Sequence, residues 1–310
     1  MIAFIFPGQG SQYVGMGKNI YKNFNTARHI FEEASDILNI DMKKLCFDGP
    51  DSEINLTANA QPAILTNSIA ILNVIKEEFS ISPDYVAGHS LGEYSALVSN
   101  NSIKFSDAVY TVRKRGDFMQ DAVPVGVGAM AAILGLNSSI VDELCEQASN
   151  NQFIVEPANY NSPVQTVISG HKQAVEMAGE IAKDKGAKRV VPLDVSAPFH
   201  SSLMKPAAEK LSDILKSINV QQGDVPIVTN VNAQINKDSK KIHGLLVDQV
   251  VKPVRWTESI IEMYDSKVKC FIEIGPKNIL SGLIRRTKSD VISKNIDNLE
   301  DIKGFNIDGI

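Results

Sequence analysis

The sequence predicts a mixed α/β protein with a parallel sheet, into which a smaller unit is inserted, and three observations point to this. Short apolar runs, typical of strands buried on both faces, lie at residues 2–6 and 84–88. Residues 57–79 separate these runs and carry apolar side chains at helical spacing. Between Pro124 and Pro198 the pattern changes to shorter strands and helices. The strand, helix, strand order of the first part favours the α/β class.

Length and composition exclude several kinds of protein. The chain has 310 residues, 44% apolar and 22% charged, so it can bury a large core. The net charge is -5 and the basic residues are scattered, which argues against nucleic acid as a partner. Cys46, Cys145 and Cys270 form no CxxC pair, which favours a reducing cytoplasm over a disulfide framework or zinc site. No apolar run approaches the ~18 residues of a membrane span, so we expect a soluble protein without a membrane partner. We also expect a monomer.

The main body is predicted on both sides of the insertion. Further helices are expected over residues 91–98, 106–119, 203–218, 242–250 and 258–264, and further strands near residues 227–231 and 268–274. Because the same α/β pattern continues after the insertion, we assign residues 1–124 and 198–310 to one large subdomain.

The inserted unit completes a motif of its own. Its predicted elements follow the order strand, helix, strand, strand, helix, strand, which is the ferredoxin-like βαββαβ unit. They cover residues 129–134, 138–149, 153–158, 164–169, 172–185 and 189–193. Because Val123-Pro124 and Ala197-Pro198 bound the segment, we place an inserted subdomain at residues 125–197.

The sequence GHSLG at residues 88–92 matches the GxSxG pattern of a nucleophilic serine. A predicted strand ends before it and a predicted helix follows, as in the elbow of α/β hydrolase-like catalytic subdomains. The tight turn would strain the backbone of Ser90, and only glycine leaves room on either side. The N–H of Leu91, at the helix start, would then point toward an oxyanion on the substrate. The alternative is a glycine-flanked helix cap with Ser90 at the N-cap.

A serine hydroxyl needs a base within hydrogen-bond reach before it can attack a carbonyl. His89 adjoins the serine, but successive residues around a sharp turn project apart. His29 and His243 lie on predicted helices, and His171 lies in a turn of the inserted unit. His200 lies where the chain returns from the insertion, and such junctions commonly line the cleft between subdomains. We favour His200, although the residues alone leave the other histidines open.

Seven motifs follow one another along the chain from residue 6 to residue 276. They are FPGQGSQ (6–12), GHSLGE (88–93), RGDFMQ (115–120), GAMAAILG (128–135), NYNSP (159–163), APFHS (197–201) and EIGP (273–276). Together they resemble the malonyl-CoA:acyl carrier protein transacylases, in the acyltransferase family of fatty acid and polyketide synthesis. Several motifs in one order are far more specific than any single motif.

The resemblance implies roles for the residues that match these motifs. Ser90 matches the nucleophile and His200 the general base. Gln9 matches the glutamine whose backbone N–H forms an oxyanion hole with that of Leu91. Arg115 matches the arginine that holds the free carboxylate of the malonyl group. The chemistry supports this role, because a guanidinium grips a carboxylate with two parallel hydrogen bonds.

Three further residues receive roles next to these. Gln249 matches a glutamine whose backbone carbonyl accepts the other ring N–H of the base, so no aspartate is needed. Gln61 matches a position that lines the acyl pocket, and a helix-start residue beside Pro62 is an equal alternative. Phe199 precedes the base and would crowd a methyl branch on the acyl group, which predicts malonyl over methylmalonyl substrates.

The resemblance implies an enzyme that transfers a malonyl group from malonyl-CoA to the phosphopantetheine thiol of acyl carrier protein. A ping-pong mechanism through an acyl-serine would supply extender units for fatty acid synthesis. No metal or redox cofactor is implied. The alternatives are a trans-acting malonyltransferase of a polyketide pathway, a serine thioesterase or esterase, and a non-catalytic carrier-binding module. A simple esterase has no use for a carboxylate clamp at Arg115. A binding module without chemistry has no need for all four of Ser90, His200, Arg115 and Gln9.

Overall fold

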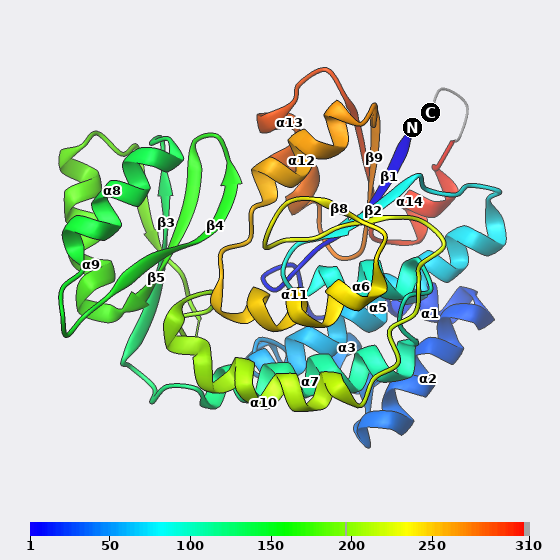
Figure 1. The fold of residues 1–310 in the computed structure, drawn as a ribbon. Coiled ribbons are helices and arrows are strands. Elements are labelled where there is room, and N and C mark those ends of the chain that lie inside the picture. The colour runs from blue at the N-terminus through cyan, green and yellow to red at the C-terminus, as the bar shows by residue number, and fades with distance from the viewer. Residues whose placement is uncertain (196, 307–310) are drawn as a thin grey trace.

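A six-stranded sheet forms the centre of the larger part of the molecule (Figure 1). The computed structural model describes residues 1–195 and 197–306. The strands are β1 (Ile2–Phe6), β2 (Tyr85–Gly88), β7 (Ile227–Val228), β8 (Ile235–Asn236), β9 (Cys270–Ile274) and β10 (Ile292–Ile296). Their order is β10-β9-β1-β2-β7-β8, and all neighbours pair in parallel except β7 and β8. The predicted α/β class with a parallel sheet is confirmed.

Helices cover both faces of this sheet. On β1, Phe4 and Phe6 point into one core cluster, and Ala3 and Ile5 point into another. The first core includes α2 (Asn25–Leu38), α5 (Thr57–Glu78), α6 (Gly92–Ser99), α7 (Phe105–Asp121), α10 (Lys205–Lys216) and α11 (Ser239–Val251), and the second includes α12 (Trp256–Asp265) and α13 (Ile279–Thr287). This double burial explains why the strand is a continuous apolar run rather than an alternating one.

The helix α5 is the longest described helix and lies in the core. Its residues from Thr57 to Ile75 are almost all buried, including polar ones such as Gln61 and Asn67, so the helix is surrounded on every side. It packs along α7, which brings Gln61 of α5 next to Arg115 of α7. Neither α5 nor any other helix in the described ranges is long and apolar enough to cross a membrane.

A second sheet, drawn in green in Figure 1, lies to one side of the main body. It consists of β3 (Gly128–Leu134), β4 (Val155–Ser162), β5 (Gln165–His171) and β6 (Arg189–Pro192), with α8 (Ser138–Ala148) and α9 (Lys172–Asp184). The strand order is β4-β5-β3-β6, and every pairing is antiparallel. The order of elements along the chain is the predicted one.

Both faces of β3 in this small sheet are covered, by different partners. Ala131 and Ile133 pack in a separate core with α8 and α9. Met130 and Ala132 point the other way and belong to the core of the main body. The small sheet therefore forms a wall against the main body.

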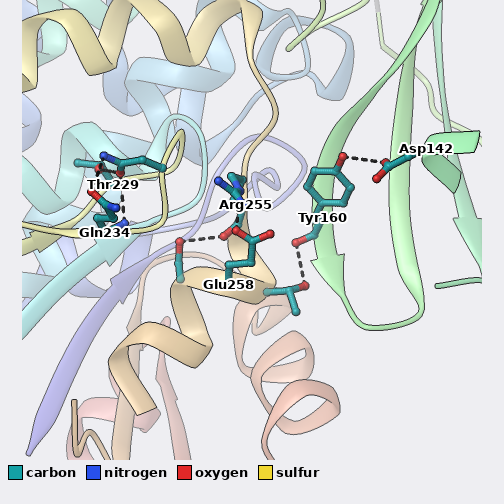
Figure 2. Close-up of polar contacts among 9 residues, drawn as sticks. Asp142, Tyr160, Thr229, Gln234, Arg255 and Glu258 are labelled. Atoms are coloured by element: carbon teal, nitrogen blue, oxygen red, sulfur yellow. Dashed lines mark hydrogen bonds and ion pairs between the residues drawn. The ribbon is translucent and has the colours of Figure 1, made fainter. Parts of the chain in front are cut away.

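An extended segment before α12 ties β4 to the main body. The N–H of Val254 donates to the carbonyl of Ala158, and its carbonyl accepts from the N–H of Tyr160, both at 2.9 Å. The Thr257 hydroxyl donates to the Tyr160 carbonyl at 2.9 Å. Figure 2 shows the Tyr160 side chain turned the other way, toward Asp142, to which its hydroxyl donates at 2.8 Å. Main-chain hydrogen bonds thus fix the small sheet next to the strand ends of the large one.

Some elements differ from the prediction. The strand expected at residues 227–231 ends at Val228, because a turn follows in which the Ala233 N–H donates to the Thr229 carbonyl at 3.0 Å. The expected helix at residues 203–218 is divided into the 3-10 turn η1 (Ser202–Met204) and α10. The sequence did not indicate β8, β10, α2, α13, α1 (Lys18–Asn23), α3 (Met42–Phe47), α4 (Asp51–Ile54) or α14 (Leu299–Lys303).

Candidate active site

Ser90 lies in the tight turn between β2 and α6. Its φ angle is 52°, in the left-handed region that non-glycine residues rarely adopt. A Cβ atom on Gly88 would lie 1.9 Å from the Gly92 carbonyl oxygen, and one on Gly92 would lie 2.1 Å from the Phe6 carbonyl oxygen. Only glycine fits at either position, so the GxSxG pattern here has a steric cause. The turn presents Ser90 at the carboxyl edge of the sheet.

His200 lies within hydrogen-bond distance of the serine. Its Nε2 is 2.8 Å from Ser90 Oγ, and its Nδ1 is 2.7 Å from the Gln249 carbonyl oxygen. Because a carbonyl only accepts, Nδ1 carries the proton and Nε2 presents its lone pair to the hydroxyl. Burial and the positive charge of Arg115 lower the pKa of His200 to about 3. The imidazole is therefore neutral near pH 7, the form that a general base requires.

Arg115 reaches the serine from α7, and only 2% of it is exposed. Its Nη2 donates to Ser90 Oγ at 3.1 Å and to Gln249 Oε1 at 2.9 Å. Its Nη1 donates to Gln61 Oε1 at 2.8 Å. Three of the five N–H groups of the guanidinium are thus engaged, and among the described residues the buried Nε has no acceptor.

Two backbone N–H groups near the serine have no acceptor within the described part of the chain, those of Gln9 and Leu91. The N–H of Ser90 itself donates to Asn230 Oδ1 at 2.7 Å and is therefore occupied. Leu91 precedes α6, where N–H groups carry the partial positive charge of a helix start. Gln9 follows β1, which pairs in parallel with β2. The arrangement can hold an oxyanion between the two groups.

Asn230 is a site residue that the sequence did not indicate. Its Oδ1 accepts from the Ser90 N–H, and its Nδ2 donates to the Gly88 carbonyl at 2.7 Å. The Gln249 amide donates to the Ser90 carbonyl at 3.0 Å. Together they satisfy the polar backbone groups of the strained turn. Asn230 follows the short strand β7, and only the pairing of β7 with β2 brings it to the serine.

Glu93, the last residue of the GHSLGE motif, is buried on α6. Its Oε2 accepts from Gln249 Nε2 at 2.6 Å and from the Asn230 N–H at 3.2 Å. Burial raises its pKa to about 7, and these hydrogen bonds and the charge of Arg115 act in the opposite direction. Glu93 could have been found from the sequence, because it belongs to the GHSLGE motif, but no role was predicted for it.

The small sheet contributes side chains of β4. Asn161 Oδ1 lies 2.8 Å from His89 Nε2, and the His89 ring packs edge-on against Trp256 with centroids 5.7 Å apart. His89 is thus held by neighbours other than Ser90, as expected for successive residues of a sharp turn. Asn159, two residues before Asn161, faces the cavity at the serine.

A cavity of about 430 Å³ opens at Ser90. Its lining combines predicted site residues of the main body with residues near the small sheet, including Gln9, Ser90, Arg115, Phe199, His200, Met130, Asn159 and Leu193. Gln61, Leu91 and Gln249 are not in the lining. For Gln61 this differs from the expected position at the pocket wall, because its side chain instead lies behind Arg115. Within the described ranges, no three His, Cys, Asp or Glu side chains form a group that could hold a metal ion.

Known proteins are similar to this chain in sequence and fold. Residues 3–303 match the family model described as the acyl transferase domain. The malonyl CoA-acyl carrier protein transacylase of Bacillus subtilis is 50% identical over 285 residues, 92% of this chain and 90% of that protein. An acyl carrier protein S-malonyltransferase structure from Vibrio cholerae is 41% identical, with a TM-score of 0.95 and coverage of 98% and 99% of the two chains. A complex of a type II PKS acyl-carrier protein with its malonyl-transacylase matches at 42% identity and TM-score 0.95, covering 97% of each chain. The chain belongs to the acyl transferase domain family.

Proposed function

We propose that the protein transfers a malonyl group from malonyl-CoA to the phosphopantetheine thiol of an acyl carrier protein. The observation that carries this is the position of a buried guanidinium, Arg115, 3.1 Å from the hydroxyl of Ser90. A nucleophile with its base suits acyl transfer of any kind. A buried cation beside that nucleophile selects an acyl group that ends in a carboxylate.

The first half-reaction forms an acyl-serine. His200 Nε2 takes the proton of Ser90 Oγ while the oxygen attacks the thioester carbonyl. The N–H groups of Gln9 and Leu91 stabilise the tetrahedral oxyanion. The intermediate collapses, the bond to sulfur breaks, and coenzyme A leaves as a thiol with the proton held by His200. The Gln249 carbonyl keeps the imidazole oriented while it carries the positive charge.

The second half-reaction uses the same groups in reverse. The thiol of the carrier gives its proton to His200 and attacks the acyl-serine carbonyl. The oxyanion again lies between the same two N–H groups, and Ser90 Oγ leaves with the proton from His200. The carrier thioester is released and the free enzyme is restored, so malonyl-CoA and the carrier thiol react in turn and not together.

The geometry of a malonyl group suits the distance between the two functional groups. Its carboxyl carbon and its thioester carbon are only about 2.5 Å apart, since one methylene joins them. A malonyl group bound to Ser90 therefore has its carboxylate within reach of Arg115. An acetyl group offers Arg115 no carboxylate to bind, which favours malonyl over acetyl substrates. Phe199, in the cavity lining, restricts branching at the carbon between the two groups.

We infer that the carrier belongs to fatty acid synthesis and that the product is its extender unit. The B. subtilis relative, which is 50% identical, is named as a transacylase of acyl carrier protein without reference to a PKS, and this supports the choice over a polyketide carrier. Because one chain supplies the whole site, a monomer suffices for the reaction. Transfer rates to one holo carrier of each kind, measured side by side, test the choice. A faster transfer to the polyketide carrier would reverse it.

We also propose that the small sheet with α8 and α9 is a ferredoxin-like subdomain of residues 125–197. The strand order β4-β5-β3-β6 and the packing of both helices on one face support this. It would be inserted into a hydrolase-like catalytic subdomain formed by residues 1–124 and 198–310. In this interpretation the catalytic groups come from the larger subdomain, and the insertion closes the cavity.

The test of the reaction is the intact mass of the protein after incubation with malonyl-CoA alone. We expect one malonyl adduct on the native chain and none on Ser90→Ala. An adduct that persists in Ser90→Ala would refute the assignment. Malonate released as fast as coenzyme A would instead identify a thioesterase.

The acyl preference is tested with a panel of malonyl-CoA, methylmalonyl-CoA and acetyl-CoA. We expect Arg115→Ala to lose the preference for malonyl-CoA over acetyl-CoA. Arg113→Ala is the matched control, because Arg113 lies on the same helix but bonds to Asn59 and the Ala58 carbonyl, away from Ser90. A preference that survives in Arg115→Ala would contradict the clamp.

A further inference from the structure

Glu93 and Arg115 are two buried opposite charges joined by an amide. Glu93 is 1% exposed and Arg115 is 2% exposed. The Gln249 side chain lies between them, with Oε1 accepting from Arg115 Nη2 at 2.9 Å and Nε2 donating to Glu93 Oε2 at 2.6 Å. An arginine only donates and an ionised carboxylate only accepts, so these two partners determine which way the amide points. The transfer mechanism gives Glu93 no role of its own.

The surroundings of Glu93 leave Arg115 as its counter-charge. Asn230, on the loop after β7, and Gln249 on α11 offer it only uncharged donors. Tyr94 is the neighbouring titratable group on its own helix, and burial raises the pKa of that phenol, which stays neutral. His200 lies beyond Gln249 and is neutral because its pKa is lowered. With Glu93 ionised, the buried cluster of Glu93, Gln249 and Arg115 has no net charge.

A bound malonyl group changes this balance. Its carboxylate pairs with Arg115 and brings a second negative charge into a buried cluster with one cation. Two carboxylates that share one buried cation cannot both stay ionised without a large penalty. Burial has already brought the pKa of Glu93 to about 7, so this carboxyl is the group ready to accept a proton.

We propose that Glu93 takes up one proton from solvent when a malonyl carboxylate binds at Arg115, which returns the buried cluster to neutrality. The proton adds to the Glu93 carboxylate and no other bond changes. Glu93 is then a positioning residue. In its ionised form it holds the Gln249 amide toward Arg115, and as an acid it lets the malonyl carboxylate replace it as the counter-charge. The proposal rests on the proposed function, because it requires a malonyl ligand.

Proton uptake can be measured directly by titration calorimetry. The Ser90→Ala chain is titrated with malonyl-CoA at pH 7.5 in two buffers of different ionisation enthalpy, so that binding is observed without chemistry. We expect about 0.7 proton taken up per malonyl group bound, because most Glu93 is ionised at this pH before binding and little of it afterwards. Acetyl-CoA carries the same phosphates without the carboxylate, and we expect uptake near zero.

Two further measurements separate Glu93 from other sources of protons. At pH 5.5 the uptake with malonyl-CoA should nearly vanish, because Glu93 is already protonated. In the Ser90→Ala, Glu93→Gln chain it should be near zero at both pH values. A glutamine oxygen can still accept from Gln249 and Asn230, so the site keeps its hydrogen bonds. Glu78→Gln, at an exposed position near the end of α5, is the matched control and should leave the uptake unchanged.

Equal uptake with malonyl-CoA and acetyl-CoA would overturn the proposal, and so would full uptake in Glu93→Gln. If Glu93→Gln does not fold, the ligand comparison and the pH comparison on Ser90→Ala decide alone. A native chain that forms a malonyl adduct while Ser90→Ala shows no proton uptake contradicts this proposal and leaves the function standing. If the native chain forms no malonyl adduct, the proposed function is contradicted and this proposal with it.

Discussion

The two sheets contribute to the site in different ways. The large sheet contributes strand ends: Ser90 follows β2, and Gln9 follows β1. The small sheet contributes side chains from β3 and β4, with Met130 and Asn159 in the cavity lining and Asn161 against His89. At parallel strand ends, free backbone N–H groups and side chains converge on one point, whereas a sheet face offers a wall. The chemical step therefore depends on the large sheet, and the small sheet encloses the substrate.

We expect the largest effect for the base, His200, which lies where the chain returns from the small sheet to the main body. In His200→Ala we expect the rate of acyl-serine formation to fall about 10³–10⁴-fold, because Ser90 loses its proton acceptor. Rapid-quench mass analysis with malonyl-CoA measures this rate. His29→Ala is the control, since His29 is exposed on α2. A loss below tenfold would mean that another group acts as base.

A smaller effect is expected for Asn230, whose side chain hydrogen-bonds to the backbone of the strained turn at Ser90. Asn230→Ala removes the acceptor of the Ser90 N–H and the donor to the Gly88 carbonyl. We expect kcat to fall about 100-fold and the free energy of unfolding to fall by about 2–3 kcal/mol. Denaturant unfolding and steady-state transfer measure the two effects. Asn232→Ala is the control, because the hydrogen bonds of the Asn232 side chain to described residues all lie within its own turn. Equal losses in both variants would contradict the special role of Asn230.

The smallest effect is expected in the small sheet. Asn161→Ala removes the partner of His89 without touching Ser90, His200 or Arg115. We expect KM for malonyl-CoA to rise by less than about tenfold, kcat to stay close to that of the native chain, and stability to fall by about 1 kcal/mol. Steady-state kinetics separate KM from kcat, and Asn151→Ala, exposed in the same small unit, is the reference. A large loss in kcat would show that the small sheet takes part in the chemistry.

Local sequence predicted the features that depend on neighbouring residues. The elbow at Ser90 is one, because the strand, the turn and the two required glycines are contiguous. The six elements of the small sheet are another, since each carries its own periodicity. Gln61 shows the limit of such prediction. The resemblance matched it to a position at the pocket wall, with a helix-start residue as an equal alternative, whereas the packing of α5 on α7 places it behind Arg115.

Sequence by itself determined the parallel α/β sheet, the nucleophile elbow and, through the set of motifs, the family of the site. The resemblance also implied the bond between the Gln249 carbonyl and His200, but the other hydrogen bonds that join the groups were decided by the tertiary structure alone. Gln249 is far along the chain from Ser90, yet its carbonyl orients His200 and its amide separates Glu93 from Arg115. Asn230 reaches the turn only through strand pairing. The physical reason is that hydrogen bonds and buried charges act over a few ångströms of space, and spacing along the chain does not encode those distances.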